Sequence, residues 1–337
     1  MSYLMETYAR LPVTFVKGAG VWLWDDKGKR YLDAVAGIAV NTLGHAHPAL
    51  TQALCEQAAA LIHTSNLYGN DKQEALAERL CTLSGMDRVF FGNSGAEANE
   101  AAIKLARLYG HRKGIEEPTV IVMEESFHGR TMATLSATGS RKAQAGFEPL
   151  LHGFARAPYD DLAAVTQIAE TNRNVVAVLV EPIQGEGGVV VPHHGYLREL
   201  RALCDRHQWL LMLDEVQSGT ARSGAWFAHQ REGIVPDVMT LAKGLGSGVP
   251  IGACLARGAA AELFKPGSHG STFGGNPLAC RAGLVTLSVI EEQGLLRNAA
   301  ELGATLRQAL KLRLADVKGV VEVRGVGLMI GIELDRA

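Results

Sequence analysis

The sequence predicts an α/β protein built around a mainly parallel β-sheet. Short apolar runs recur along the middle of the chain, and stretches with helical spacing of their apolar residues lie between them. Strands that are apolar on both faces are typical of parallel sheets, because helices cover both sides of such a sheet. These two observations together favour an α/β fold over an all-helical or all-strand one.

The expected elements follow from these runs in order. Strands are expected at 88–93, 119–124, 175–181, 209–215 and 238–243. Covering helices are expected at 97–112, 160–171 and 195–207. In the last of these, one face carries the apolar residues Leu197, Leu200, Leu203 and Cys204 at helical spacing.

The two ends of the chain differ from the middle. Residues 20–35 predict a hairpin that turns at 26–28, and residues 320–334 predict two strands joined around 325–327. We therefore place a large α/β domain at 43–295 between smaller segments at 1–42 and 296–337.

Composition narrows the class of function. The 33 Lys and Arg nearly balance the 35 Asp and Glu, so neither nucleic acid nor an anionic membrane is expected as a partner. The apolar runs are shorter than the roughly 20 residues of a spanning helix, and the N-terminus lacks a signal-peptide pattern. The five cysteines are scattered, which favours a reducing compartment. We expect a soluble, cytoplasmic protein that acts on a small molecule.

A turn with two glycines at 92–95 follows the first expected strand and opens the helix "GAEANEAAIKLARLYG". Its backbone amides and helix dipole could receive a phosphate, and the Ser94 hydroxyl could donate to it. Taken alone, the turn is better explained as an ordinary helix cap with Ser94 as the capping residue.

Lys243 ends an apolar strand and enters the glycine-rich turn "KGLGSG". Burying a lysine is costly unless it is neutral or paired, so this position suits a lysine that forms a Schiff base. The common alternative is a lysine whose stem is buried while its amine reaches water.

Two acids close the strand in "LLMLDEVQSG" at 210–219. Asp214 could be a turn residue, or a magnesium ligand in a P-loop nucleoside triphosphatase, or the partner of a pyridinium nitrogen in a pyridoxal-phosphate enzyme. The P-loop interpretation loses most of its support, because the only Gly-Lys pair, Gly28-Lys29, is followed by Arg30 and lacks the earlier glycine. Glu215 is expected to point to the opposite side and to have a structural hydrogen bond.

A fourth feature, "ESFHGRTMATLSATG" at 125–139, offers Phe127 to stack on a planar ring and Arg130 to bind a carboxylate. Each alone is more typical of a core aromatic or a surface arginine. Together, the phosphate cradle, the stacking ring, the acid and the lysine favour pyridoxal 5'-phosphate as cofactor.

The chain resembles the class III pyridoxal-phosphate-dependent aminotransferases of fold type I over essentially its whole length, and among them the branch that acts on acetylornithine. The resemblance rests on an ordered set of motifs: "GIAVNTLGHAHP" (37–48), "HTSNLY" (63–68), "NSGAEANEAAIKLAR" (93–107), "SFHGRTMATLSATG" (126–139), "EPIQGEGGV" (181–189), "LDEVQSG" (213–219), "LAKGLG" (241–246) and "HGSTFGGNPLAC" (269–280). It implies a seven-stranded type of sheet in the large domain and a smaller α+β domain built from both termini.

The resemblance also implies a role for each matching residue. Lys243 would hold the cofactor as a Schiff base, Asp214 would pair with the ring nitrogen and Gln217 with the ring hydroxyl. Phe127 and Val216 would enclose the ring from its two faces. The phosphate would be bound by Ser94, Gly95 and Ala96 and by Thr272 of the other subunit, which implies a homodimer with shared active sites.

Substrate contacts are implied in the same way. Arg130 would receive a substrate carboxylate, and Glu186 would act as a gate that pairs with a second, C-terminal arginine. Asn41 and Glu181 would line the site, and the alternative for each is a buried polar group whose hydrogen bonds are satisfied. No metal is expected, because the histidines at 45–47 and 193–194 lack supporting ligand spacing.

The implied reaction transfers the δ-amino group of N2-acetyl-L-ornithine to 2-oxoglutarate, giving N-acetyl-L-glutamate 5-semialdehyde and L-glutamate in arginine biosynthesis. Alternative donors are ornithine, succinylornithine and 4-aminobutyrate, and an alternative of another class is an impaired cofactor-binding dimer with an interaction role. Two departures accompany the resemblance. "GTARSG" stands where the family commonly has G-x-G-R-T-G, and the chain stops at "GLMIGIELDRA", so we expect a truncated C-terminal segment without the second arginine.

Overall fold

A seven-stranded sheet forms the centre of the protein, whose computed structural model describes residues 3–335. Residues 1–2 and 336–337, which the expected terminal segments include, lie outside the described residues. The order of strands across the sheet is β4 (Arg88–Gly92), β10 (Gly252–Ala256), β9 (Val238–Leu241), β8 (Leu210–Asp214), β7 (Val175–Val180), β5 (Thr119–Met123) and β6 (Phe154–Ala157). β10 is antiparallel to both neighbours, while the other pairings are parallel. The predicted α/β class with a mainly parallel sheet is confirmed.

Helices cover both faces of this sheet, as the apolar strands require. Along β5, Val120 and Val122 pack with the residues of α4 (Gly95–Arg112), while Ile121 and Met123 pack with those of α8 (Tyr196–His207). This alternation is the period of two of an extended chain. Further helices around the large sheet are α3 (Asp71–Ser84), α5 (Met132–Ala137), α6 (Arg141–Gln144), α7 (Leu162–Thr171) and α9 (Pro277–Glu292).

The predicted strands and helices agree with these elements to within a few residues at their ends. The clearest difference is at 238–243, where β9 ends at Leu241 and Lys243 begins the 3-10 turn η2 (Lys243–Leu245). Two strands of the sheet, β6 and β10, were not predicted. Two other 3-10 turns are η1 (Ala228–Glu232) and η3 (Gly258–Glu262).

The terminal segments form two small antiparallel sheets of their own. The N-terminal one contains β1 (Phe15–Ala19), β2 (Trp22–Asp25) and β3 (Arg30–Leu32), which confirms the predicted hairpin and adds a strand before it. The C-terminal one is the hairpin of β11 (Val320–Val326) and β12 (Met329–Leu334). Its turn lies at 327–328, so Gly325 belongs to β11, where it pairs with Ile330.

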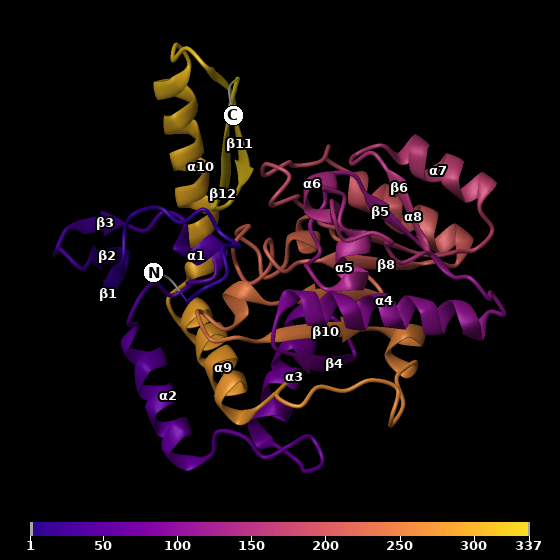
Figure 1. Ribbon diagram of the computed structural model, residues 1–337, viewed down its shortest axis with the longest axis horizontal. Coiled ribbons are helices and arrows are strands. Elements are labelled where there is room, and N and C mark those ends of the chain that lie inside the picture. Colours follow the sequence, from indigo (N-terminus) through magenta and orange to yellow (C-terminus); the bar gives the residue numbers. More distant parts are fainter. Residues whose placement is uncertain (1–2, 336–337) are drawn as a thin grey trace.

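The remaining helices connect these small sheets to the centre. They are α1 (Ala36–Ala39), α2 (Pro48–Ala60) and α10 (Leu295–Leu314). α10 and the hairpin of β11 and β12 extend away from the central sheet, on the side where α1 lies (Figure 1). Among residues 3–335, no helix is both long and apolar enough to cross a membrane.

Candidate active site

A pocket of about 440 Å³ lies at one edge of the central sheet. Apart from Val40, which follows α1, the residues that line it lie at or after the ends of β4, β5, β7, β8 and β9, or immediately precede β10. Because β10 is antiparallel to its neighbours, its beginning reaches the edge at which the other strands end. This is the edge at which ligands bind in open α/β sheets, and the volume suits a small molecule with a ring.

Most of the site residues expected from the sequence line this one pocket. They come from five segments at the ends of five strands, and they are Ser94, Gly95, Ala96, Phe127, Arg130, Glu181, Glu186, Asp214, Val216, Gln217 and Lys243. Two expected residues do not line it. Asn41 lies just behind the wall, where its Oδ1 would be 3.3 Å from a Cβ built on Gly248, and Thr272 is exposed on a different segment.

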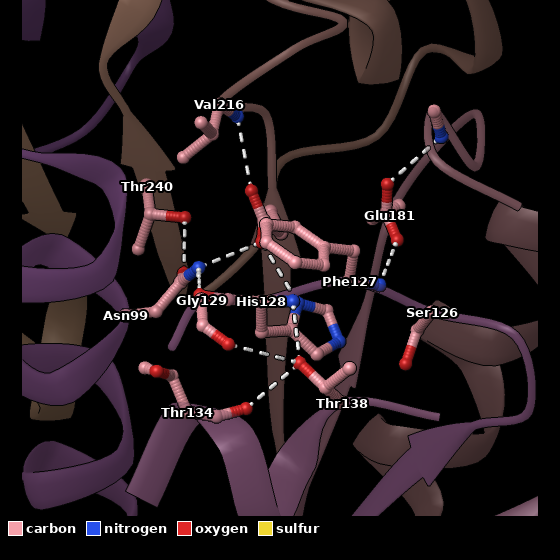
Figure 2. A network of polar contacts seen from close by, with 12 residues as sticks. Asn99, Ser126, Phe127, His128, Gly129, Thr134, Thr138, Glu181, Val216 and Thr240 are labelled. Atoms are coloured by element: carbon pink, nitrogen blue, oxygen red, sulfur yellow. Dashed lines mark hydrogen bonds and ion pairs between the residues drawn. The ribbon is translucent and has the colours of Figure 1, made fainter. Parts of the chain in front are cut away.

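The Asp214 carboxylate is buried at the base of the pocket. Its Oδ2 accepts hydrogen bonds from Asn99 Nδ2 at 2.7 Å and His128 Nδ1 at 2.8 Å, and its Oδ1 accepts one from the backbone N–H of Val216 at 3.0 Å. Figure 2 shows these contacts converging from Asn99, His128 and Val216. A carboxylate oxygen can accept two hydrogen bonds, so Oδ1 keeps one acceptor position in a pocket that can hold a ligand.

Asn99 and His128, two partners of this carboxylate, were not predicted as site residues from the sequence. Asn99 also donates to the carbonyl oxygen of His128 at 2.8 Å and accepts from Thr240 Oγ1 at 2.7 Å, which fixes the orientation of its amide. The His128 backbone N–H donates to Thr138 Oγ1 at 3.0 Å. Asn99 is the one asparagine among the buried residues of α4, and this was the sequence signal that could have indicated a partner for Asp214.

The start of α4 forms the part of the pocket that could bind a phosphate. The first amides of a helix have no partner within the helix, and here Ser94 caps only one of them by accepting from Glu97 N–H at 3.2 Å. A Cβ built on Gly95 would lie 2.8 Å from Val216 Cγ1, so this position has no room for a side chain. The amides at the helix start are therefore free to approach an anion closely.

Lys243 lies in the same pocket with its backbone in the left-handed region, at φ 41°. Burial lowers the pKa of its amine, and the nearby carboxylates of Asp214 and Glu186 oppose this shift. Burial therefore favours the neutral amine, which is the form that can attack an aldehyde or take up a proton.

Glu181 connects two loops of the pocket wall. Its Oε1 accepts from the backbone N–H of Phe127 at 2.9 Å, and its Oε2 accepts from that of Gly185 at 2.9 Å (Figure 2). Burial raises the pKa of this carboxyl to about 7, while His128 opposes the shift and the Asp214 charge adds to it. Glu181 thus carries a proton over much of the mildly acidic range.

Arg130 and Glu186 place opposite charges on the pocket wall. The Arg130 guanidinium carbon lies 5.8 Å from the centre of the Phe127 ring, so the cation is close to the aromatic face. The arginine is exposed, which leaves its donors available to a carboxylate that enters from solvent.

Glu215, the second acid of "LLMLDEVQSG", points away from the pocket, as predicted. Its Oε1 accepts from the backbone N–H of His229 at 2.9 Å and from His229 Nδ1 at 3.0 Å. Its Oε2 accepts from Ser218 Oγ and from Ala228 N–H, both at 2.8 Å. Three of these bonds join Glu215, which directly follows β8, to η1, and the fourth holds Ser218, so Glu215 has the structural role expected for it.

The histidine pairs of the sequence have other partners. His45 Nε2 lies 2.7 Å from Asp33 Oδ2, and His193 Nδ1 lies 2.7 Å from Asp160 Oδ1. Within residues 3–335, no group of three or more His, Cys, Asp or Glu side chains could hold a metal ion.

The pocket and fold define an α/β enzyme with a partly buried lysine in the same pocket as a buried carboxylate, and comparison with known proteins identifies its family. The chain belongs to the class-III aminotransferases, whose family model matches residues 3–337. It is 66% identical over 334 residues to the acetylornithine aminotransferase of Nitrosomonas europaea, covering 99% of this chain and 85% of that protein. It is 60% identical over 335 residues to acetylornithine aminotransferase 1 of Bordetella bronchiseptica, again covering 99% and 85%.

Solved structures with the same fold include two relevant aminotransferases. The ornithine aminotransferase of Toxoplasma gondii superposes with a TM-score of 0.96 at 39% identity, covering 99% of this chain and 80% of that one. The acetylornithine aminotransferase of Elizabethkingia anophelis superposes with a TM-score of 0.88 at 38% identity, covering 99% and 82%. The predicted family and enzyme class are confirmed.

The cofactor of this family is pyridoxal 5'-phosphate, and the residues of the pocket fit it. The open acceptor position on Asp214 Oδ1 suits a protonated ring nitrogen, and the uncapped amides at Gly95 and Ala96 suit a phosphate. Lys243, with its lowered pKa, suits covalent attachment to an aldehyde.

Proposed function

We propose that this protein transfers the δ-amino group of N2-acetyl-L-ornithine to 2-oxoglutarate, forming N-acetyl-L-glutamate 5-semialdehyde and L-glutamate in arginine biosynthesis. The observation that carries the proposal is the gathering of Lys243, Asp214 and Arg130 in one pocket of a chain 66% identical to an acetylornithine aminotransferase. The absence of a disulfide among the five cysteines, all of them free thiols, supports a cytoplasmic location.

Each pocket residue has a task in this proposal. Pyridoxal phosphate supplies the electron sink that makes removal of a proton beside the transferred nitrogen feasible. Lys243 would hold the cofactor and would also carry that proton on its amine. Asp214, held by Asn99 and His128, would present its carboxylate to the ring nitrogen. Phe127 and Val216 would enclose the ring, and Gln217 would bond to its hydroxyl.

Recognition of the substrate is assigned to the pocket wall. Arg130 would bind the far carboxylate of each substrate, so that the reacting carbon faces Lys243. Glu186 would act as the gate residue and place a negative charge opposite the Arg130 cation. Asn41 would support the pocket wall from behind Gly248. Replacing Arg130 with Ala should raise the KM for both substrates and leave the visible absorbance of the bound cofactor unchanged.

We also propose a homodimer that shares its active sites. Thr272 lies outside the pocket in its own chain, so it could complete the phosphate site only of a second copy. Large apolar side chains are exposed on the segments around it: Leu61, Ile62, Leu67, Tyr68 and Phe273. An exposed apolar patch of this kind marks a surface that a partner covers.

The decisive experiment is the half-reaction of the purified protein with single amino donors. Acetylornithine should bleach the absorbance of the bound cofactor faster than succinylornithine or 4-aminobutyrate. Ornithine is the second candidate, because the ornithine aminotransferase of Toxoplasma gondii has the same fold at a TM-score of 0.96. Binding of the cofactor without a response to any donor would reject the proposed reaction and favour a cofactor-binding dimer without turnover.

A further inference from the structure

Residues 184–190 form a closed loop, here called the Glu186 loop, that carries Glu186 into the pocket. The backbones of Gln184 and Val190 exchange two hydrogen bonds of 3.0 Å, which close the loop at its base. Inside it, the N–H groups of Gly188 and Val189 both donate to the carbonyl oxygen of Gly185 at 3.1 Å. The loop is therefore held together by its own hydrogen bonds.

The large domain holds the base of this loop. Glu181 accepts from the N–H of Gly185, and the Gln184 side chain donates to the carbonyl oxygen of Glu124 at 2.7 Å. Neither of these bonds reaches the tip of the loop beyond Glu186.

Arg324, on β11, holds the tip. Its Nε and Nη2 both donate to the carbonyl oxygen of Gly188, at 3.0 Å and 2.8 Å. Its Nη1 bonds to Glu322 Oε2 at 3.0 Å and forms an ion pair with Glu333 on β12. The two carboxylates fix the guanidinium on the hairpin, so its other two donors are presented in one direction.

The opposite strand of the hairpin is shaped for the same contact. Gly331 is the cross-strand partner of Arg324. A Cβ built on Gly331 would lie 3.1 Å from the Gly188 carbonyl oxygen and 3.2 Å from Val189 Cβ. The absence of a side chain at Gly331 thus lets the loop lie against the hairpin, where Arg324 reaches it.

We propose that Arg324 is a positioning residue, which holds the Gly188 carbonyl and thereby fixes Glu186 in the pocket for substrate binding. The proposal rests on the proposed function, in which Glu186 faces the substrate. It assigns the C-terminal hairpin a task in the active site, although the Arg324 side chain is not among the residues that line the pocket.

The test compares Arg324→Ala and Arg324→Lys with Val321→Thr, a control on an exposed side chain of the same hairpin. For Arg324→Ala we expect the KM for acetylornithine to rise about tenfold with kcat changed less than about threefold, because loss of position weakens binding. Arg324→Lys keeps the positive charge but has only one nitrogen atom to donate from, so its KM should fall between those of wild type and Arg324→Ala. In a Glu186→Gln background, Arg324→Ala should have little further effect, since both changes act through one carboxylate.

A readout that does not depend on activity accompanies the kinetics. Hydrogen exchange of the amides at 184–190 should become about tenfold faster in Arg324→Ala than in the control, with the amides at 210–214 unchanged. If Arg324→Ala does not fold, Gly331→Ala takes its place, because it keeps the arginine but pushes the loop away from the hairpin. This variant should also raise the KM for acetylornithine and the exchange rate of the amides at 184–190.

The outcomes separate the two proposals. An unchanged exchange rate at 184–190 would show that Arg324 does not hold the Glu186 loop, whether or not the protein is active. Faster exchange with an unchanged KM, or effects of Arg324→Ala and Glu186→Gln that simply add, overturns its role in positioning Glu186. A wild-type protein that fails to react with any donor rejects the proposed function. The exchange experiment still tests whether Arg324 holds the Glu186 loop.

Discussion

His128 and Asp214 form a buried pair in which His128 Nδ1 lies 2.8 Å from Asp214 Oδ2. Since a carboxylate oxygen can only accept, the hydrogen bond places a proton on Nδ1. The other partners of this carboxylate, Asn99 Nδ2 and the Val216 N–H, are also donors. The site is therefore built around a group that accepts hydrogen bonds and carries negative charge.

Replacing Asp214 with Asn tests this arrangement. The amide NH₂ would meet a donor whichever way it turns, and the negative charge opposite the ring nitrogen would be lost. We expect kcat to fall by at least about 100-fold, within the range of a lost electrostatic contribution of about 3 kcal/mol or more. Steady-state kinetics at saturating cofactor measure this, and a variant within about threefold of wild type would contradict the role of Asp214.

Replacing Lys243 with Ala removes the amine that holds the cofactor. We expect borohydride to attach cofactor covalently to the wild-type protein and to leave the variant without it, because the neutral amine favoured by burial is the attacking group. Mass spectrometry of the reduced proteins measures the attachment. The control is Lys142→Ala, which alters an exposed lysine outside the pocket and should still be labelled at Lys243. Covalent labelling of Lys243→Ala would refute the assignment.

The raised pKa of Glu181 predicts a dependence of stability on pH. Because the pKa in the folded state is about 7, against 4.5 as the ordinary value, the folded protein binds more protons than the unfolded chain between these values. Its contribution to the free energy of unfolding is therefore present below about pH 4.5 and is lost as pH rises through 7, by up to about 3 kcal/mol.

Urea unfolding of the cofactor-free protein at pH 5 and pH 8 measures this contribution. The wild-type protein should lose about 3 kcal/mol of its free energy of unfolding between pH 5 and pH 8 through Glu181. Glu181→Gln should lack this loss, because its amide does not titrate. Identical pH dependence in both proteins would mean that Glu181 is ionised throughout. The variant should be less stable overall at pH 5, because one backbone N–H of Phe127 or Gly185 loses its acceptor.

Replacing Glu215 with Ala should destabilise the protein without a direct effect on the chemistry. The change leaves the buried N–H groups of Ala228 and His229 without an acceptor and opens a cavity, at a cost of about 3 to 5 kcal/mol. The midpoint of urea unfolding measures it, with Glu170→Ala on the exposed face of α7 as the control. Equal midpoints for the two variants would show that Glu215 is not a structural anchor.

Five strands of the central sheet could be predicted because each is a mostly apolar run, and four of them, β5, β7, β8 and β9, are buried along their whole length. β6 and β10 escaped prediction for physical reasons. β6 has only four residues with an arginine among them, and β10, "GACLA", is composed mainly of small residues without β-branching. Their place in the sheet comes from pairing with neighbours far away in the sequence.

The pocket was predictable where a chemical group must stand at the end of a strand, as Lys243 and Asp214 do. It was not predictable where a residue acts through another. Asn99 looks like one polar residue in a helix until its contact with Asp214, 115 positions away, is known. The same holds for the bond of Arg324 to the Gly188 carbonyl oxygen, because a backbone acceptor leaves no trace in a pattern of side chains.

Because β10 runs antiparallel to its neighbours, the segments before and after it should differ in how well they tolerate insertions. The segment 248–251 enters the strand from the pocket side, so lengthening or reshaping it would alter the shape of the cavity directly. The chain that leaves β10 after Ala256 does so at the far edge of the sheet, where Asp87 accepts from Gly258 N–H at 2.7 Å. Insertions before this strand could therefore alter substrate preference. Insertions after it would lie on the surface and leave the pocket unchanged.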